Sequence, residues 1–186
     1  IKTIGDAYMC AGGIPIENST NPMNAVIAAI QIQDYMSKLK FDAIANYKDY
    51  WEIRLGINTG PVTAGIIGNL KLAYDVWGST VNEAQQMEKL GNPGEVTITG
   101  STFNYIEPYF ECEFLGKVAT KGNVDVDMYR VKQIKAELSK KGEGIVPNQK
   151  FSEIVELHHF SSIKYYKTEH FVLDYLKKGL SKKLLY

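Results

Sequence analysis

The sequence contains little cysteine and histidine and has no long apolar run. Only two cysteines, Cys10 and Cys112, occur among 186 residues, and their separation matches neither a disulfide framework nor a zinc-binding spacing. The longest apolar stretch, 25–32, is far shorter than the roughly 20 residues that cross a bilayer, and Ile1 does not open a signal peptide. We therefore expect a cytoplasmic location and no membrane contact from these residues, although segments outside them could attach an intact protein to a membrane.

The chain also lacks an excess of charge of either sign. Lys plus Arg and Asp plus Glu number 21 each, so no overall field directs the chain to nucleic acid, and we expect no nucleic-acid partner. Hydrophobic residues make up 45% and charged residues 23%, which is typical of a folded globular protein. The length fits one domain with an appended helical segment.

Periodicity and turn residues predict alternating strands and helices. Residues 1–14 predict two short β runs joined at Gly5 and Asp6, and apolar residues at helical spacing follow a cap at Asn21. The later segments predict, in order, a strand over 51–58, a glycine-rich loop over 59–68, a strand over 74–77, a helix capped by Ser79 or Thr80 and ending before Gly91, a strand over 95–100, a short helix capped by Ser101, and two strands joined by a turn at 121–123. This alternation indicates an α/β or α+β domain with helices packed on a sheet.

The composition changes near the end of the last predicted strand. We assign residues 1–135 to the main domain, 136–150 to a charged linker, and 151–186 to a helical connector or the start of a further domain. The C-terminal segment holds His158, His159 and His170 together with Tyr165 and Tyr166. Adjacent helical residues point about 100° apart, so the histidines do not favour a metal site, and an amphipathic connector is the simpler interpretation.

Three sequence blocks together resemble the catalytic domains of class III adenylate and guanylate cyclases. They are KTIGDAYM followed by a glycine pair, RLGINTGPVTAGIIG, and YDVWGSTVNEAQQME, in the family's order and at similar intervals over residues 1 to about 131. The resemblance implies a ferredoxin-like α+β cyclase domain with a mixed or antiparallel sheet, whose first strand and helix would precede Ile1. It also implies head-to-tail pairing with a second copy or a cyclase-like partner domain, with sites built from both partners. The glycine-rich block is expected to shape the sheet and the dimer face, since it lacks the Lys-Ser/Thr of a phosphate-binding P-loop.

The resemblance assigns Asp6 as the second of two metal-binding aspartates, with the first one upstream of this chain. Mg²⁺ and Mn²⁺ prefer oxygen ligands, and two such ions are expected in the intact domain, where they would bridge the triphosphate and the attacking hydroxyl. The alternative is that Asp6 only fills a β-turn with its backbone hydrogen bonds.

The resemblance assigns Lys2 and Asp75 to recognition of the purine. An ammonium can donate to adenine N1 and a carboxylate can accept from the N6 amino group, whereas the family's guanylate cyclases usually carry Glu and Cys at these positions. The pair therefore favours ATP, unless both are solvated surface charges. Trp77 could line the nucleotide pocket, and a place in the core or the dimer interface fits it equally well.

The resemblance assigns Asn82 and Gln86 to the ribose and the reacting phosphate. They are four residues apart and share one helix face. The family usually carries Arg at the second position, so Gln86 can donate a hydrogen bond but cannot supply charge, or it is a helix surface residue. Lys121 matches, with altered spacing, the lysine that neutralises the leaving pyrophosphate, or it is a surface lysine.

These assignments predict an adenylate cyclase, which converts ATP to cyclic AMP and pyrophosphate by metal-assisted attack of the 3′-hydroxyl on the α-phosphate. One alternative is a degenerate cyclase-homology domain that binds nucleotide or a partner without turnover, which Gln86 would favour. Another is a module for folding or dimerisation only.

Overall fold

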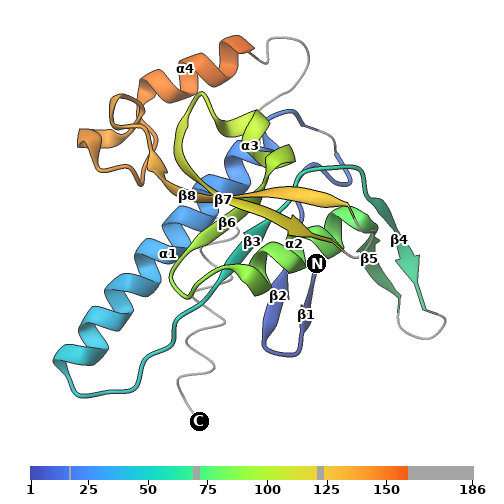
Figure 1. The fold of residues 1–186 in the computed structure, drawn as a ribbon, viewed down its shortest axis with the longest axis horizontal. Helices are drawn as coiled ribbons and strands as arrows, with labels where there is room; N and C mark the ends of the chain where they lie inside the picture. The colour runs from blue at the N-terminus through green and yellow to red at the C-terminus, as the bar shows by residue number, and fades with distance from the viewer. Residues whose placement is uncertain (17, 69–71, 121–123, 159–186) are drawn as a thin grey trace.

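The computed structural model describes residues 1–158 except 17, 69–71 and 121–123 (Figure 1). Lys121, His159, Tyr165, Tyr166 and His170 therefore lie outside the described residues. The elements are β1 (Lys2–Ile4), β2 (Ala7–Met9), α1 (Asn21–Ala45), β3 (Leu55–Ile57), β4 (Thr63–Ile67), β5 (Ala73–Trp77), α2 (Ser79–Leu90), β6 (Val96–Thr99), α3 (Gly100–Ile106), β7 (Phe110–Ala119), β8 (Asp125–Ile134), two 3₁₀ turns (Ala136–Leu138 and Lys140–Gly142) and α4 (Gln149–His158).

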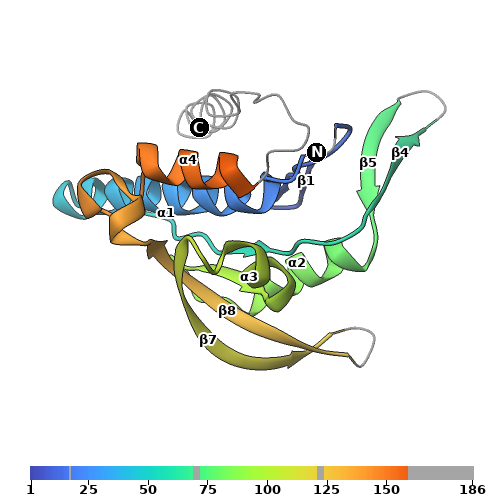
Figure 2. The ribbon, with the colours of Figure 1, turned by 90° about the horizontal axis from the view of Figure 1, so that it is seen from above.

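The central element is a four-stranded mixed sheet in the order β3-β6-β8-β7. Strands β3 and β6 run parallel, while β8 pairs antiparallel with both β6 and β7. Two further hairpins, β1–β2 and β4–β5, form separate two-stranded sheets. Helices α1 and α4 lie on one side, and the β7–β8 ribbon curves away on the other (Figure 2). The predicted α+β class with helices packed on a mixed or antiparallel sheet is confirmed.

The hydrophobic core lies between α1, the sheet and the C-terminal segment. It consists of side chains exposed by 8% or less: Met23, Val26, Ala29, Ile30, Val96, Ile98, Ile106, Tyr109, Phe110, Val131, Ile134, Leu138, Phe151 and Val155. Among the described residues no helix combines the length and the apolar character needed to cross a membrane.

Three predicted helix caps are wrong. Helix α1 follows Thr20 rather than a cap at Asn21, and α2 follows Gly78, whose φ of 137° few other residues adopt. Thr80 lies inside α2, where its hydroxyl donates to the carbonyl of Pro61 at 2.6 Å. Helix α3 is capped by Thr99, whose hydroxyl accepts from the Thr102 amide at 3.4 Å. Two of the residues predicted as caps have tertiary partners instead, Thr80 at Pro61 and Ser101 at Asn58, and these partners cannot be read from the local sequence.

The glycine-rich loop predicted over 59–68 contains a strand. Thr63–Ile67 forms β4, which pairs antiparallel with β5 in a register that joins Thr63 to Trp77. The strand predicted over 51–58 is shorter than expected, because only Leu55–Ile57 forms β3.

Residues 136–158 pack against the rest of the chain. Leu138, Phe151 and Val155 belong to the core, and the backbone amide of Ile134 donates to the carbonyl of Gly144 at 2.8 Å. The segment predicted as a linker is folded here, with an isolated β-bridge between Ser139 and Pro147. The division of the chain into a domain, a linker and a connector stays a prediction.

Candidate nucleotide site

Lys2 and Asp75 lie in direct contact although 73 positions separate them. The Lys2 Nζ atom donates to Asp75 Oδ2 at 2.6 Å, which links β1 to β5. The Asp75 side chain is 7% exposed and that of Lys2 is 42% exposed, so the ammonium covers the carboxylate and faces solvent itself. The structure therefore brings together the two residues that sequence analysis assigned to the purine.

The Asp75 carboxylate is also held from its own backbone. Its Oδ1 atom accepts from the Val76 amide at 2.9 Å, which leaves Oδ2 for Lys2. The hydrogen bond from Lys2, followed by the one from the Val76 amide, lowers the pKa of Asp75 below its ordinary value. The site therefore carries a charged donor beside a charged acceptor at neutral pH.

The strand that holds Asp75 leads directly into α2. Trp77 ends β5 and is 37% exposed, and α2 begins at Ser79, which places Asn82 in its first turn. Asn82 is exposed on this helix. The order of β5 and α2 thus brings Asp75, Trp77 and Asn82 to one end of the helix.

Gln86 contacts the end of β7. Its Nε2 atom donates to the carbonyl oxygen of Ala119 at 2.6 Å. Beyond Ala119, the Thr120 amide and hydroxyl both donate to the carbonyl of Val124, at 3.1 and 2.9 Å. Gln86 therefore ties α2 to the end of β7, a contact that sequence reasoning did not foresee.

Asp6 occupies the tip of the β1–β2 hairpin, as predicted. Gly5 has a φ of 61°, and the register pairs Ile4 with Ala7, so Gly5 and Asp6 form the two-residue turn. Asp6 is exposed, and the length of β1 puts it on the order of 10 Å from Lys2. The structure does not bring Asp6 into contact with the other predicted residues that it describes.

Asp6 is placed so that its carboxylate could supply one ligand to a hard cation. Among the described residues, no group of three or more His, Cys, Asp or Glu side chains is placed to hold a metal ion. An exposed carboxylate at a hairpin tip supplies oxygen ligands, so further ligands would have to come from nucleotide phosphates or from other residues.

Sequence reasoning missed a polar network beside the site. Asn58, just after β3, donates through Nδ2 to the Thr80 carbonyl at 3.1 Å and to Glu83 Oε2 at 2.8 Å. Its Oδ1 atom accepts from the hydroxyls of Thr99 at 2.6 Å and Ser101 at 2.7 Å. Asn58 belongs to the block RLGINTGPVTAGIIG, but its hydrogen-bond partners lie 22 to 43 positions away in the sequence.

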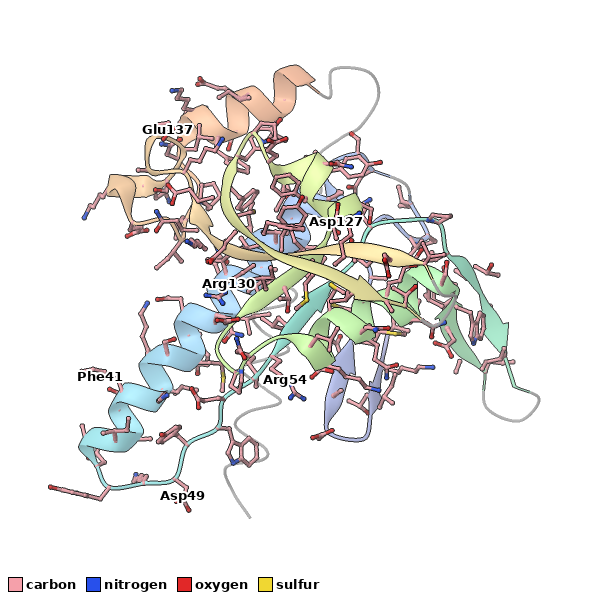
Figure 3. All side chains as sticks on the ribbon, in the orientation of Figure 1. Phe41, Asp49, Arg54, Asp127, Arg130 and Glu137 are labelled. Carbon is pink, nitrogen blue, oxygen red and sulfur yellow. The ribbon has the colours of Figure 1, made fainter. Side chains whose placement is uncertain are left out.

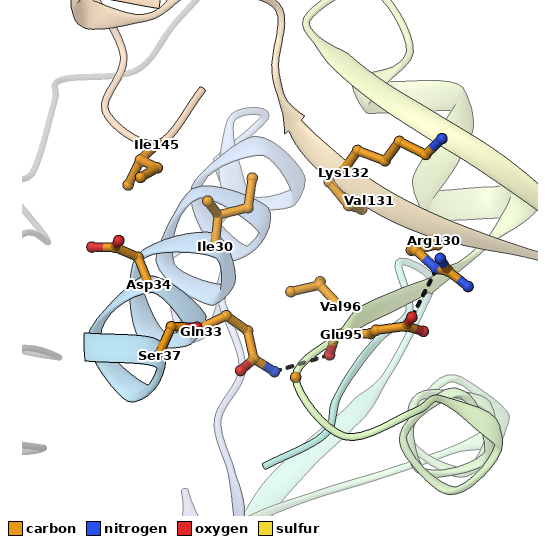
Figure 4. A pocket seen from close by; sticks show the side chains of 11 residues that line it. Ile30, Gln33, Asp34, Ser37, Glu95, Val96, Arg130, Val131, Lys132 and Ile145 are labelled. Carbon is orange, nitrogen blue, oxygen red and sulfur yellow. Dashed lines mark hydrogen bonds and ion pairs between the residues drawn. The ribbon is translucent and has the colours of Figure 1, made fainter. Parts of the chain in front are cut away.

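A separate cavity of about 360 Å³ lies between α1, β6 and β8 (Figure 4). Its charged side chains all have ion-pair partners: Arg130 lies 3.1 Å from Glu95, which also lines the cavity, while Lys132 and Asp34 pair with Glu113 and Lys38 outside it. Gln33 closes one side by donating to the carbonyls of Ile53 and Glu95, both at 3.0 Å. Figure 3 shows Arg130 and Asp127 on β8, Phe41 on α1, and Asp49 in the connection that follows this helix.

Comparisons with known proteins agree with the fold and the motifs. The sequence matches the family model of the adenylate and guanylate cyclase catalytic domain over residues 1–133. It is 30% identical over 157 residues to adenylate cyclase type 9 of Gallus gallus, which covers 82% of this chain and 11% of that protein. It is 34% identical over 119 residues to guanylyl cyclase C of Homo sapiens, which covers 63% of this chain and 11% of that protein. The chain thus spans about a tenth of the length of these relatives.

A solved structure shares the architecture. The catalytic core of a rhodopsin-guanylyl cyclase with converted specificity, in complex with ATPαS, superposes with a TM-score of 0.62 at 33% identity. The match covers 70% of this chain and 69% of that one. With the family model matching residues 1–133, the chain belongs to the class III adenylate and guanylate cyclase catalytic domain family.

Proposed function

We propose that this domain acts in a cyclase that converts ATP to cyclic AMP and pyrophosphate. The observation that carries the choice of ATP is the contact between Lys2 and Asp75 at 2.6 Å. The relatives include both adenylate and guanylyl cyclases, so the choice of base depends on this pair rather than on overall similarity.

The pair presents a donor next to an acceptor. Adenine offers the complementary edge, because its N1 atom accepts and its N6 amino group donates, while guanine offers a donor at N1 and an acceptor at O6. The ribose fixes which side of the base faces each residue, so guanine cannot reverse its edge without moving the sugar. With guanine, the Lys2 ammonium or the Asp75 carboxylate would meet a group of its own kind, a donor or an acceptor. The charged group would then be unpaired, which lowers the affinity for guanine.

The remaining roles follow the same proposal. Asn82 orients the ribose, and Gln86 acts near the phosphates together with Lys121, which follows β7 in the sequence. Asp6 would hold Mg²⁺ or Mn²⁺, which supplies charge that lowers the pKa of the 3′-hydroxyl. Since Gln86 already donates to the Ala119 carbonyl and carries no charge, we expect turnover slower by on the order of 10²-fold than with a charged donor there.

The proposed partner is a second copy or a related cyclase domain. The β4–β5 hairpin projects away from the rest of the fold in both views (Figures 1 and 2). Its exposed apolar side chains are Ile66, Ile67, Leu72, Tyr74 and Trp77. An apolar hairpin of this kind supports a role as a dimer arm.

The base preference is tested by exchanging the two residues in the full-length protein. Lys2→Glu with Asp75→Cys should move the ratio of kcat/KM for ATP and GTP toward GTP by at least 10-fold, measured as cyclic AMP and cyclic GMP formed with Mn²⁺. The matched control is Lys38→Glu with Asp34→Cys, which makes the same changes in another ion pair, on α1. An unchanged ratio in the first variant would reject the purine-reading pair.

The second candidate is a nucleotide-binding domain without turnover, favoured by Gln86 at the position of the usual arginine. It predicts that the full-length protein binds an ATP analogue in calorimetric titration but forms no cyclic nucleotide, and that Gln86→Arg restores none. Loss of cyclic AMP formation on Asp6→Ala, with the analogue still bound, would favour the enzyme instead.

A further inference from the structure

We infer that Asn58 is a positioning residue that fixes the first turn of α2, and thereby Asn82, for the reaction proposed above. The inference rests on that proposed function for its effect on turnover. The placement of the helix by Asn58 is an independent claim with its own measurement.

The first step is that the Asn58 amide uses its full hydrogen-bonding capacity. Nδ2 donates to the Thr80 carbonyl and to Glu83 Oε2, and Oδ1 accepts from the Thr99 and Ser101 hydroxyls. An amide has two donor hydrogens and two acceptor lone pairs, so no capacity remains. No aliphatic or singly functional side chain can replace all four bonds.

The second step is where those partners lie. Thr99 ends β6 and Ser101 lies in the first turn of α3. Thr99 and Thr102 are fully buried, so the acceptor side of Asn58 is anchored to the sheet. The donor side reaches two residues of α2 that flank Asn82 in sequence, Thr80 and Glu83. Asn58 therefore holds the helix turn that carries Asn82 in a fixed position relative to the sheet.

The third step is a second attachment at the same turn. The Thr80 hydroxyl donates to the Pro61 carbonyl at 2.6 Å, and a Cβ atom on Gly60 would lie 2.7 Å from the Thr80 oxygen. The chain after β3 thus approaches α2 too closely for a side chain at position 60. Loop and helix turn form one unit, in which Asn58 supplies the bonds to the sheet.

The consequence concerns the ribose. A displacement of about 1 Å in a group that positions a substrate can cost on the order of 10² in rate, even when binding is little affected. Removing the Asn58 donors should therefore lower kcat far more than it raises KM.

The test uses an isosteric change and its reversal. Asn58→Asp keeps the shape but removes both donors and sets a carboxylate against that of Glu83, which should lower kcat by at least 10-fold. Adding Glu83→Gln restores one donor between the two side chains and returns their total charge to that of the wild type. The double variant should therefore recover most of the lost kcat. Asn46→Ala, which removes a side-chain bond to the Asp42 carbonyl at the far end of α1, is the control and should leave kcat unchanged.

Hydrogen exchange of the backbone amides measures the stability of the first turn of α2 in the same full-length variants. This measurement does not depend on whether the protein forms cyclic nucleotide. The Asn82 amide donates to the Gly78 carbonyl at 3.4 Å, and Asn58→Asp should speed its exchange while the amides of β8 keep their rates. The double variant should slow it again. Unchanged exchange in Asn58→Asp, or exchange that rises equally throughout the sheet, would overturn the inference.

A double-mutant cycle separates positioning from general stability. If Asn58 acts through Asn82, then Asn58→Asp should cost little further activity in an Asn82→Ala background. Equal costs in both backgrounds would contradict the inference. If the wild type forms no cyclic nucleotide, the proposed function fails, and the exchange rates alone decide the role of Asn58.

Discussion

At the scale of single residues, Asp75 is held in place by two hydrogen bonds that the proposed recognition of adenine would use. One carboxylate oxygen accepts from the Val76 amide, within β5, and the other accepts from Lys2. A base that bonds to Asp75 Oδ2 and to Lys2 Nζ would meet two groups that already hold each other in place, so binding would not have to order them. Under the proposed function, the ion pair would therefore be a preorganised recognition element.

The lowered pKa of Asp75 makes this pair a source of pH-dependent stability. Because Lys2 first, and the Val76 amide second, lower the folded-state pKa, the carboxylate stabilises the fold above its unfolded pKa of about 3.9. This contribution is lost as the pH falls through the lower, folded-state value. The free energy of unfolding should therefore differ between wild type and Asp75→Asn by a constant amount from pH 5 to 8, and by less below about pH 4.

Urea unfolding at a series of pH values measures this difference. Lys2→Gln is the matched variant, since it removes the larger cause of the shift and should flatten the acid dependence. A difference at pH 3 as large as that at pH 7 would contradict the ion pair as the cause.

At the scale of elements, the approach of α2 to β3 depends on Gly56. A Cβ atom there would meet the backbone amide of Glu88 and the carbonyl of Ala84 at distances that real Cβ atoms do not show. Backbone cannot move aside as a side-chain tip can. Gly56→Ala should therefore lower the free energy of unfolding by about 3 kcal/mol.

The comparison variant is Gly65→Ala in β4, where the nearest atom, on Trp77, would be 3.8 Å away in ordinary contact. Chemical denaturation of both variants gives the two free energies. Equal stability of the two variants would show that α2 can shift without cost.

Elements set by local turn chemistry were predictable, and those set by distant partners were not. Gly5 and Asp6 marked the first hairpin and Gly91 the end of α2, because such residues suit turns by their own backbone preferences. Strand β4 was missed, because Gly65 within it and the glycines on either side suggest a loop, and only its pairing with β5 shows the strand. The pairing of Lys2 and Asp75 in one proposed role followed from a family resemblance, but their direct contact and the network of Asn58 required the tertiary structure.

At the scale of the whole molecule, the core extends beyond the residues that match the family model. Phe151, on α4, is 4% exposed and packs edge-to-face against Phe110 at a ring-centroid distance of 5.9 Å. It also contacts the Tyr109 ring at 5.4 Å. The family model ends at residue 133, so α4 is an added layer of the same core.

Removing that ring should destabilise the whole fold. Phe151→Ala should lower the free energy of unfolding by about 3 to 5 kcal/mol, because it leaves a cavity among buried aromatics. Phe41→Ala makes the same change at a side chain that is 79% exposed, and should cost less than about 1 kcal/mol. If both variants unfold at the wild-type denaturant concentration, α4 does not contribute to the core.

The β4–β5 hairpin is the surface to which the proposed dimerisation is assigned. Ile66 is 68% exposed and lies opposite Tyr74, which is 40% exposed, so the arm presents apolar side chains to solvent. If this arm joins two copies, Ile66→Lys places a charge in the interface and should weaken dimerisation at least 10-fold, as measured by sedimentation. Ile44→Lys, the same change at a 53% exposed position on α1, should leave dimerisation unaltered.

The same variant distinguishes an interface from a site residue. A protein whose sites require both copies should lose activity on Ile66→Lys when dilute and regain it as the protein concentration rises, because mass action restores the dimer. A defect within one copy would lower the specific activity equally at every concentration. Wild-type sedimentation of Ile66→Lys would exclude this arm as the contact between copies.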